Sequence, residues 1–222
     1  MIFIRNADIN CQRVQNGGYG SEIAHMVTIS PRKLAGKWTI GYALDIHTTS
    51  STYLGDDEYG RPQFDTQRSE IGELLYRLKY GSDKSVITVI TETVADFVRK
   101  QKWAIELVIP VPPSRVGRAY QPVSALSKAL AAELGVGFCR DCVIKVKNTP
   151  ELKEVYELDK RLALLQGAYA VARAKVASKK VLVFDDLYRS GATLNSVCET
   201  LKDQGRVKTV YVLTLTMTRS HR

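Results

Sequence analysis

Long apolar runs are missing from this sequence, and no hydrophobic stretch approaches the roughly 18 residues that a membrane-spanning helix requires. The first residues, MIFIRN, also lack the basic and then apolar order of a secretory signal peptide. Membrane and secreted proteins are therefore disfavoured as classes, and we expect a cytoplasmic location.

Cysteine and histidine are scarce, with four and three residues respectively. Cys139 and Cys142 have the spacing of half a structural zinc site, but a closed site needs two further ligands and the sequence has no second pair. The histidines, His25, His47 and His221, are scattered along the chain. We therefore interpret the two cysteines as thiols at the edge of a strand, reduced as is usual in the cytosol.

Acidic residues are in deficit, and the deficit is confined to one half of the chain. Residues 1–111 carry 13 basic and 13 acidic residues, whereas residues 112–222 carry 19 and 10, which accounts for the net charge of +9. A basic surface attracts polyanions. A phosphorylated metabolite, a nucleic acid and a merely soluble basic surface all remain open at this point.

The sequence has no internal repeat and no low-complexity tract. Its first part contains short β-like runs at residues 2–4, 24–29 and 38–46, separated by glycine and proline, and the polar stretch 50–62 is predicted to be a loop. Apolar residues at helical spacing then predict a helix over residues 68–80, with Ser69 as N-cap and Gly81 as C-terminal stop. A second helix is predicted over residues 85–102.

From residue 107 onward, strands and helices alternate. Alternation of this kind predicts parallel strands joined by crossover helices. The predicted strands are 107–111, 142–146, 168–171, 181–184 and 207–215, and the predicted helices are 122–134, 158–165 and 192–204.

The clearest chemical signal is the segment 181–193, VLVFDDLYRSGAT. A continuously apolar strand, typical of a strand covered on both faces, ends in Asp185 and Asp186, and a short loop then leads into a helix. Ligands of parallel sheets lie beyond the carboxyl ends of the strands, and a helix N-terminus with unpaired N–H groups binds phosphate. Gly191 lets the backbone approach a ligand closely, and the Ser190 and Thr193 hydroxyls add hydrogen bonds.

Two carboxylates beside a phosphate site require an explanation, because they repel phosphate. They fit if they accept hydrogen bonds from hydroxyls, so a ribose 5-phosphate would satisfy the loop with its phosphate and the acids with its 2- and 3-hydroxyls. A Walker-type nucleotide loop would need a Gly-Lys-Ser/Thr ending, which the segment lacks. An acidic strand end followed by an ordinary helix cap is the alternative.

The segment resembles the phosphoribosyl-pyrophosphate motif of type I phosphoribosyltransferases over its whole length: a hydrophobic strand, two acids and a small-residue loop ending in Gly-x-Thr. Loops of that family usually read Thr-Thr-Gly where this chain reads Arg-Ser-Gly. The resemblance implies an α/β fold of the type I phosphoribosyltransferase kind, with a twisted, mostly parallel sheet flanked by helices. It also implies contacts to phosphoribosyl pyrophosphate from Asp185, Asp186, Leu187, Tyr188, Arg189, Ser190, Gly191, Ala192 and Thr193.

Two further segments resemble the ComF-like, amidophosphoribosyltransferase-like branch of that family. The stretch PPSRVGRAYQ, after the strand at 107–111, is similar to its pyrophosphate loop, which implies contacts from Pro113, Ser114, Arg115 and Arg118. KVKNTPELK, from residue 145, is similar to its flexible loop, in which Lys145 and Lys147 would close over the site. A solvated basic loop and a surface charge run are the respective alternatives.

The helix ending in LKY at Tyr80 also fits this branch. Its Lys79 could reach the site or point to solvent, and we predict that it points to solvent. ComF-like proteins begin with a cysteine-rich zinc module, whereas this chain has Cys11 alone in that region. The resemblance therefore implies a small β-rich hood at residues 1–63 and a phosphoribosyltransferase core at residues 64–222.

The resemblance implies that a nitrogen nucleophile displaces pyrophosphate from the anomeric carbon of the ribose, with Asp185 and Asp186 as catalytic residues. Mg²⁺ would be carried mainly by the oxygens of the substrate, with no metal ligands assigned to the protein. Two other functions stay open: a DNA-uptake accessory protein that stacks single-stranded DNA on Tyr120 and Tyr188, and a sensor that binds the phosphoribosyl ligand without turnover. The acceptor, the role of residues 1–60, a homodimer and catalytic competence itself are left undecided by the sequence.

Overall fold

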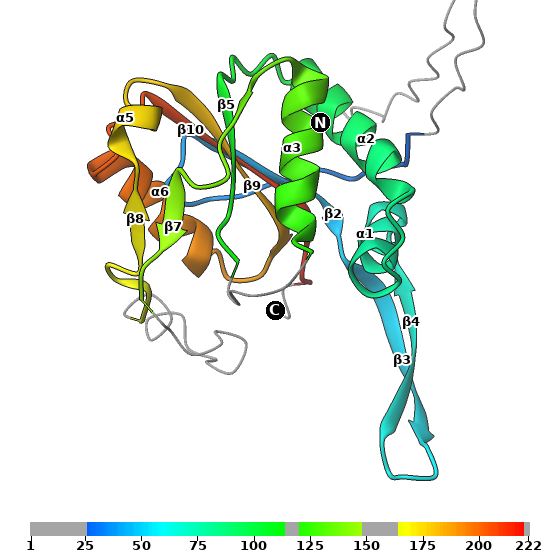
Figure 1. Cartoon of the computed structure of the whole chain (residues 1–222). Helices are drawn as coiled ribbons and strands as arrows, with labels where there is room; N and C mark the ends of the chain where they lie inside the picture. The colour runs from blue at the N-terminus through cyan, green and yellow to red at the C-terminus, as the bar shows by residue number, and fades with distance from the viewer. Residues whose placement is uncertain (1–25, 114–119, 148–163, 220–222) are drawn as a thin grey trace, which may run out of the picture.

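Six strands form a central sheet in the order β1-β2-β10-β9-β5-β6, and all neighbours are parallel except the β1–β2 pair (Figure 1). The computed structural model describes residues 26–113, 120–147 and 164–219. In chain order the sheet strands are β1 (Arg32–Lys33), β2 (Ile40–Ile46), β5 (Leu107–Pro110), β6 (Gly137–Phe138), β9 (Lys180–Tyr188) and β10 (Thr209–Met217).

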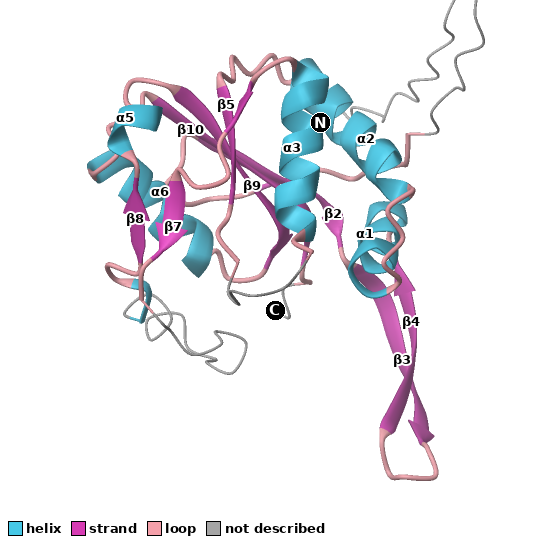
Figure 2. Cartoon of the chain, in the orientation of Figure 1, coloured by secondary structure: helices cyan, strands magenta, loops and turns pink. Residues whose placement is uncertain are grey.

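Helices cover both faces of this sheet (Figure 2). One face packs against α1 (Glu70–Tyr80), α2 (Val86–Lys100) and α3 (Pro122–Leu134), and the other against α5 (Arg173–Val176) and α6 (Ala192–Asp203). Strand β9 supplies both cores, because successive side chains of a strand point to opposite faces. Its Val181 and Val183 pack on the α6 side, and its Leu182 and Phe184 pack on the three-helix side.

The predicted fold class, a mostly parallel α/β sheet flanked by helices, is confirmed. Several predicted boundaries are confirmed as well. Helix α1 begins after Ser69, whose hydroxyl accepts a hydrogen bond from the Gly72 N–H, and is followed by Gly81 as C-cap. Helix α3 ends at Gly135, whose φ of 67° is the left-handed conformation that glycine adopts without strain.

The predicted loop at residues 50–62 is wrong, because most of it lies in a β-hairpin. Strands β3 (Thr48–Asp56) and β4 (Pro62–Arg68) pair antiparallel and project away from the sheet (Figure 1). Nearly all of the hairpin is exposed, so neither face carries the apolar alternation by which a half-buried strand is recognised. Cross-strand contacts, including the Tyr53 and Phe64 rings at 5.6 Å, hold the two strands together instead.

Strands β1 and β2 fall within the range predicted for the N-terminal hood, yet both belong to the central sheet. Ile40 to Ile46 pair in register with Tyr211 to Met217 of β10. A hood that ends at residue 63 stays a prediction, and these hydrogen bonds tie residues 32–46 to the sheet of the predicted core. The predicted strands at residues 2–4 and the start of 24–29 lie outside the described residues.

Strands β7 (Val143–Lys145) and β8 (Tyr169–Val171) form a separate antiparallel pair rather than joining the parallel sheet. The turn before β7 carries a disulfide between Cys139 and Cys142, so the prediction of reduced thiols is wrong for this pair. Cys142 is fully buried and Cys139 packs against the same core, which brings the two sulfurs together on one side of the turn. Most of the helix predicted at residues 158–165 lies outside the described residues.

Helices of the length and apolarity needed to cross a bilayer are absent from residues 26–113, 120–147 and 164–219.

The Ser69 hydroxyl is predicted to contribute measurably to stability, because it joins α1 to the sheet. It accepts from the Gly72 N–H at 3.2 Å and donates to the Ile46 carbonyl oxygen at 2.6 Å. Ser69→Ala should lower the free energy of unfolding by about 1–2 kcal/mol in urea denaturation. Ser85→Ala is the matched control, because Ser85 precedes α2 without a side-chain cap bond and its hydroxyl donates to Asp83 at the exposed surface. It should lose less stability, and equal losses for the two variants would contradict the role of Ser69.

Candidate functional site

The acid pair lies inside strand β9, not in the loop after it. The sequence predicts a strand that ends at Phe184, whereas β9 continues to Tyr188 and pairs with β10 as far as Met217. Because side chains alternate along a strand, Asp185 points to the α6 side of the sheet and Asp186 to the α1 side. The two carboxylates therefore occupy different surroundings, although they are adjacent in sequence.

On the α6 side, Asp185 lies in a partly buried group of hydroxyls. Thr214 is opposite Asp185 in the β9–β10 register, and its buried Oγ1 has no hydrogen-bond partner among the described residues. The Tyr169 hydroxyl, from β8, hydrogen-bonds Thr193; burial and the Asp185 charge raise the pKa of Tyr169 to about 12. Desolvation, and then the charge of Asp186, raise the pKa of Asp185 well above its usual range, so its surroundings favour the protonated form.

On the α1 side, Asp186 forms an ion pair with Lys79. The Lys79 Nζ lies 2.6 Å from the Asp186 Oδ2, and the two side chains are 24% and 16% exposed. The prediction that Lys79 points to solvent is therefore wrong. The periodicity of α1 places Lys79 outside its most buried face, which led to the prediction of solvent exposure. Periodicity does not show that the last turn of α1 packs beside the end of β9.

His47, which follows β2, is a second residue at this edge that the sequence analysis did not assign to the site. Its Nδ1 lies 3.3 Å from the Thr216 Oγ1, which in turn donates to the Asp186 carbonyl oxygen at 3.1 Å. Burial is the largest cause that lowers the pKa of His47, and the charges of Arg68, Lys79 and Arg189 lower it further. A neutral imidazole is thus expected at pH 7, within a positive electrostatic environment.

The loop after β9 leaves the N-terminus of α6 without a side-chain cap. Gly191 precedes the helix with a φ of 75°, and no side chain caps this end with a hydrogen bond. A Cβ on Gly191 would lie 2.8 Å from the Tyr188 hydroxyl, so both the backbone conformation and the available space require glycine. The helix therefore begins with backbone N–H groups that suit an anion, and the acid pair stands a few residues before them.

The remaining predicted contacts of this segment have mixed exposure. Arg189 is exposed, Ser190 is half-buried, and Ala192 is buried in the α6 core. Leu187 is half-buried and pairs with Thr216 of β10.

The predicted pyrophosphate loop and flexible loop are only partly described. Pro113 is exposed beyond the end of β5, while Ser114, Arg115 and Arg118 lie outside the described residues. Lys145 is the last residue of β7, opposite Tyr169 of β8. Lys147 donates from its Nζ to the Gln166 carbonyl oxygen at 2.8 Å. The roles of these residues stay predictions.

The described residues do not form a protein-held metal site. No group of three or more histidine, cysteine or carboxylate side chains converges within residues 26–113, 120–147 and 164–219. At the acid pair, the Asp186 carboxylate is already paired with Lys79, and Asp185 points to the opposite face of the sheet. The two carboxylates therefore do not converge on one Mg²⁺ ion, which would need several ligands from elsewhere.

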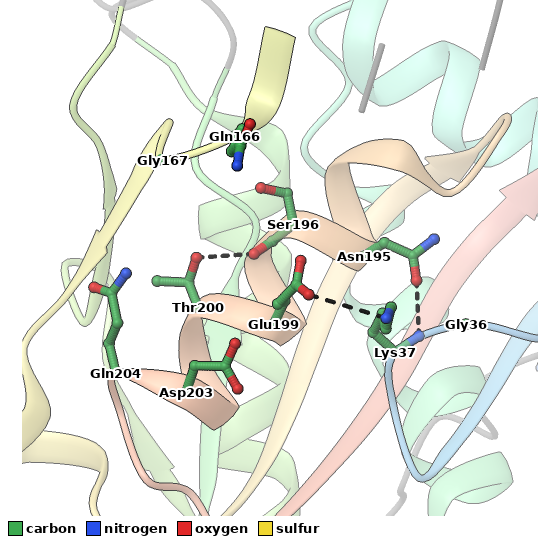
Figure 3. A pocket seen from close by; sticks show the side chains of 10 residues that line it. All are labelled: Gly36, Lys37, Gln166, Gly167, Asn195, Ser196, Glu199, Thr200, Asp203 and Gln204. Carbon is green, nitrogen blue, oxygen red and sulfur yellow. Dashed lines mark hydrogen bonds and ion pairs between the residues drawn. The ribbon is translucent and has the colours of Figure 1, made fainter. Parts of the chain in front are cut away.

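A cavity of about 700 Å³ lies away from the acid pair, on the outer side of α6 (Figure 3). It is lined by Gly36 and Lys37 before β2, by Gln166 and Gly167 before β8, and on the side of α6 by Asn195, Ser196, Glu199, Thr200, Asp203 and Gln204. Much of its polar lining is already paired within the protein. The Asn195 Oδ1 accepts a hydrogen bond from the Lys37 backbone N–H at 2.7 Å, and the Lys37 Nζ lies 3.9 Å from the Glu199 Oε1. We place the candidate site at the end of β9, because the perturbed carboxyl and the uncapped helix meet there.

Solved phosphoribosyltransferase structures resemble this fold at low similarity. Adenine phosphoribosyltransferase from Saccharomyces cerevisiae shares 14% identity, covers 74% of this chain and 83% of its own, and has a TM-score of 0.43. The enzyme from Giardia lamblia shares 15%, covers 77% and 94%, and has a TM-score of 0.45. Hypoxanthine phosphoribosyltransferase from Staphylococcus aureus shares 15%, covers 63% and 70%, and has a TM-score of 0.37.

No family model and no curated protein sequence matches the chain. Identities and TM-scores this low carry no functional argument, so the proposal below depends on the residues of this chain alone.

Asp185 is predicted to make stability fall as the pH rises. Its pKa is raised from 3.8 to about 8 in the folded state, so within this window the folded protein retains a proton that the unfolded chain releases. The stability gained from this group is present at low pH and is lost as the pH rises through about 8. Asp185→Asn should therefore stabilise the protein more at pH 8 than at pH 5, by roughly 1–2 kcal/mol after allowance for screening.

Thermal unfolding across this pH range measures the effect. Asp65→Asn, on the exposed hairpin strand β4, is the matched control and should leave the pH dependence of the wild type unchanged. A pH dependence that is the same in Asp185→Asn and in the wild type would contradict the raised pKa.

Proposed function

We propose that this protein binds phosphoribosyl pyrophosphate at the carboxyl end of β9 and transfers the phosphoribosyl group to a nitrogen acceptor, releasing pyrophosphate. The observation that carries the proposal is the N-terminus of α6, which no side chain caps and which begins at Gly191, four residues after Leu187 and close to a carboxylate pair. A phosphate suits the helix end, and sugar hydroxyls suit a carboxylate. A ribose 5-phosphate presents both groups within one small molecule.

The two carboxyls would have different roles in binding the sugar. Asp186 is paired with Lys79 and points to the α1 side, where it would accept hydrogen bonds from the ribose hydroxyls. Asp185, whose pKa is raised by burial, would in its protonated form donate one hydrogen bond and accept another. The backbone N–H groups at residues 191–193, with Ser190 and Arg189, would hold the 5-phosphate.

Rate acceleration in such a site would come from position and charge. Departure of pyrophosphate leaves positive character on the ribose ring, as in glycoside cleavage. The Asp186 carboxylate, fixed by Lys79 on the α1 side of β9, would lie near that charge and stabilise it. A Mg²⁺ ion, if required, would arrive on the pyrophosphate oxygens of the substrate, because the described residues provide no dedicated ligand set.

The DNA-binding alternative gains no specific support from the aromatic residues on which it depends. Tyr120 and Tyr188 are both half-buried, the Tyr120 hydroxyl is buried, and the Tyr188 hydroxyl would contact a Cβ at Gly191. Single-stranded DNA binding, a ligand-sensing role without turnover, and a homodimer stay predictions.

Asp186→Asn tests the proposed function. Loss of the negative charge should weaken binding of phosphoribosyl pyrophosphate by about tenfold or more and remove turnover, because the hydroxyls lose a charged acceptor. Calorimetric titration measures the binding. Pyrophosphate release with Mg²⁺ and a panel of bases and amines measures the turnover.

Asp96→Asn is the matched control, because Asp96 also forms a lysine ion pair, with Lys100 at 2.8 Å, but lies on α2 away from the end of β9. It should bind and turn over like the wild type. Equal affinity of Asp186→Asn and wild type for phosphoribosyl pyrophosphate would count against the site.

A further inference from the structure

Lys79 has more hydrogen-bonding capacity than its structural partner uses. A lysine ammonium carries three N–H donors, and Asp186 is the one partner of Nζ that the structure describes. The side chain keeps 24% of its surface exposed, so it is not fully enclosed by the protein. An ammonium of this kind, at the mouth of a proposed ligand site, is available to a second negative group.

Positive charge also accumulates around His47, whose pKa is lowered by burial and then by the charges of Arg68, Lys79 and Arg189. Arg68 pairs with Thr48 across the base of the hairpin, next to His47. Gly72 of α1 packs against the carbonyl oxygen of His47, which brings the helix to the same edge. Arg189 follows Asp186 by three residues, is exposed, and forms no ion pair with another described residue. Glu73, which pairs with Arg68 at 3.2 Å, and Asp186 are the carboxylates that offset these cations.

We propose that Lys79 is the main contact of a second anion-binding subsite, which receives a phosphate or carboxylate group of the ligand at the end of α1. The proposal rests on the proposed function, in which Asp186 accepts hydrogen bonds from the sugar hydroxyls. Lys79 would then keep one N–H donor on Asp186 and direct its other two N–H donors to the second negative group of the ligand. The two anion sites lie on opposite sides of β9, because α6 packs on one face of the sheet and α1 on the other.

This arrangement specifies the ligand as one with negative groups at two ends. A sugar ring that lies across the end of β9 would point its phosphate to the α6 N-terminus and its other end to Lys79. Two sources supply the second negative group: the leaving pyrophosphate, or an acid group on the acceptor. Both have the same chemistry for Lys79, and suitable small molecules distinguish them.

Calorimetric titration of wild type, Lys79→Gln and Lys79→Arg tests the subsite. Inorganic pyrophosphate represents the leaving group, and the pairs nicotinate with nicotinamide and orotate with uracil represent acidic and neutral acceptors. If the second negative group is the leaving pyrophosphate, Lys79→Gln should weaken binding of pyrophosphate by about tenfold or more. If it is an acid group on the acceptor, Lys79→Gln should weaken binding of nicotinate or orotate by the same factor. Lys79→Arg should stay within about threefold of the wild type, because it retains the charge.

Lys100→Gln is the matched control, because Lys100 also lies in the last turn of a helix and pairs with an aspartate, Asp96. It should bind every probe like the wild type. Lys79→Gln leaves Asp186 without its cation, which lowers stability. The double variant Lys79→Gln/Asp186→Asn removes that unpaired charge, and pyrophosphate binding to it should stay weak, since pyrophosphate has no sugar hydroxyls.

Ribose 5-phosphate, titrated into the wild type, separates the two hypotheses. If it does not bind, the proposed function fails. If ribose 5-phosphate binds, the affinities of the variants decide about Lys79. Should Lys79→Gln and the double variant bind pyrophosphate, nicotinate and orotate as tightly as the wild type, Lys79 is only a structural ion-pair partner and the proposed subsite is wrong. The subsite is also overturned if the wild type binds pyrophosphate no better than uracil and neither acid better than its neutral counterpart.

Discussion

Strand β9 remains a regular strand through the acid pair, and the candidate site depends on this regularity. Its hydrogen bonds to β10 continue past Asp185 and Asp186, so the alternation of the strand directs the two carboxylates to opposite faces of the sheet. Two like charges on adjacent residues would otherwise compete for one environment. Separation lets Lys79 pair with Asp186, while burial and the Asp186 charge raise the pKa of Asp185. One backbone constraint thus gives the two carboxylates different surroundings.

Elements that are far apart in the sequence meet at the end of β9. Helix α1 brings Lys79 to Asp186, strand β8 brings the Tyr169 hydroxyl to Thr193, and His47 contacts Thr216 beside the Asp186 carbonyl. These contacts cross the sheet edge where parallel strands end, which is where α/β folds bind ligands. The cavity along α6 is a poorer candidate for the ligand site, because much of its polar lining is already paired within the protein.

Much of the fold was predictable because its signals are local. Ser69, Gly81 and Gly135 mark helix ends by their own conformational preferences, and the apolar run before Asp185 marks a strand covered on both faces. The β3–β4 hairpin was missed because it buries little and carries no apolar alternation. The disulfide was missed because the expected compartment, not the spacing of Cys139 and Cys142, led to the prediction of free thiols.

The sequence by itself determined which residues carry the chemistry at the end of β9, because an acid pair and a glycine-bearing helix start are encoded within one short segment. Tertiary structure alone decided the surroundings of those residues. The fold buries Asp185, which raises its pKa, places Thr214 of β10 opposite it, and brings Lys79 of α1, more than 100 residues away in sequence, to Asp186. Local sequence rules describe what a residue is, whereas its protonation and its partners depend on what the fold packs beside it.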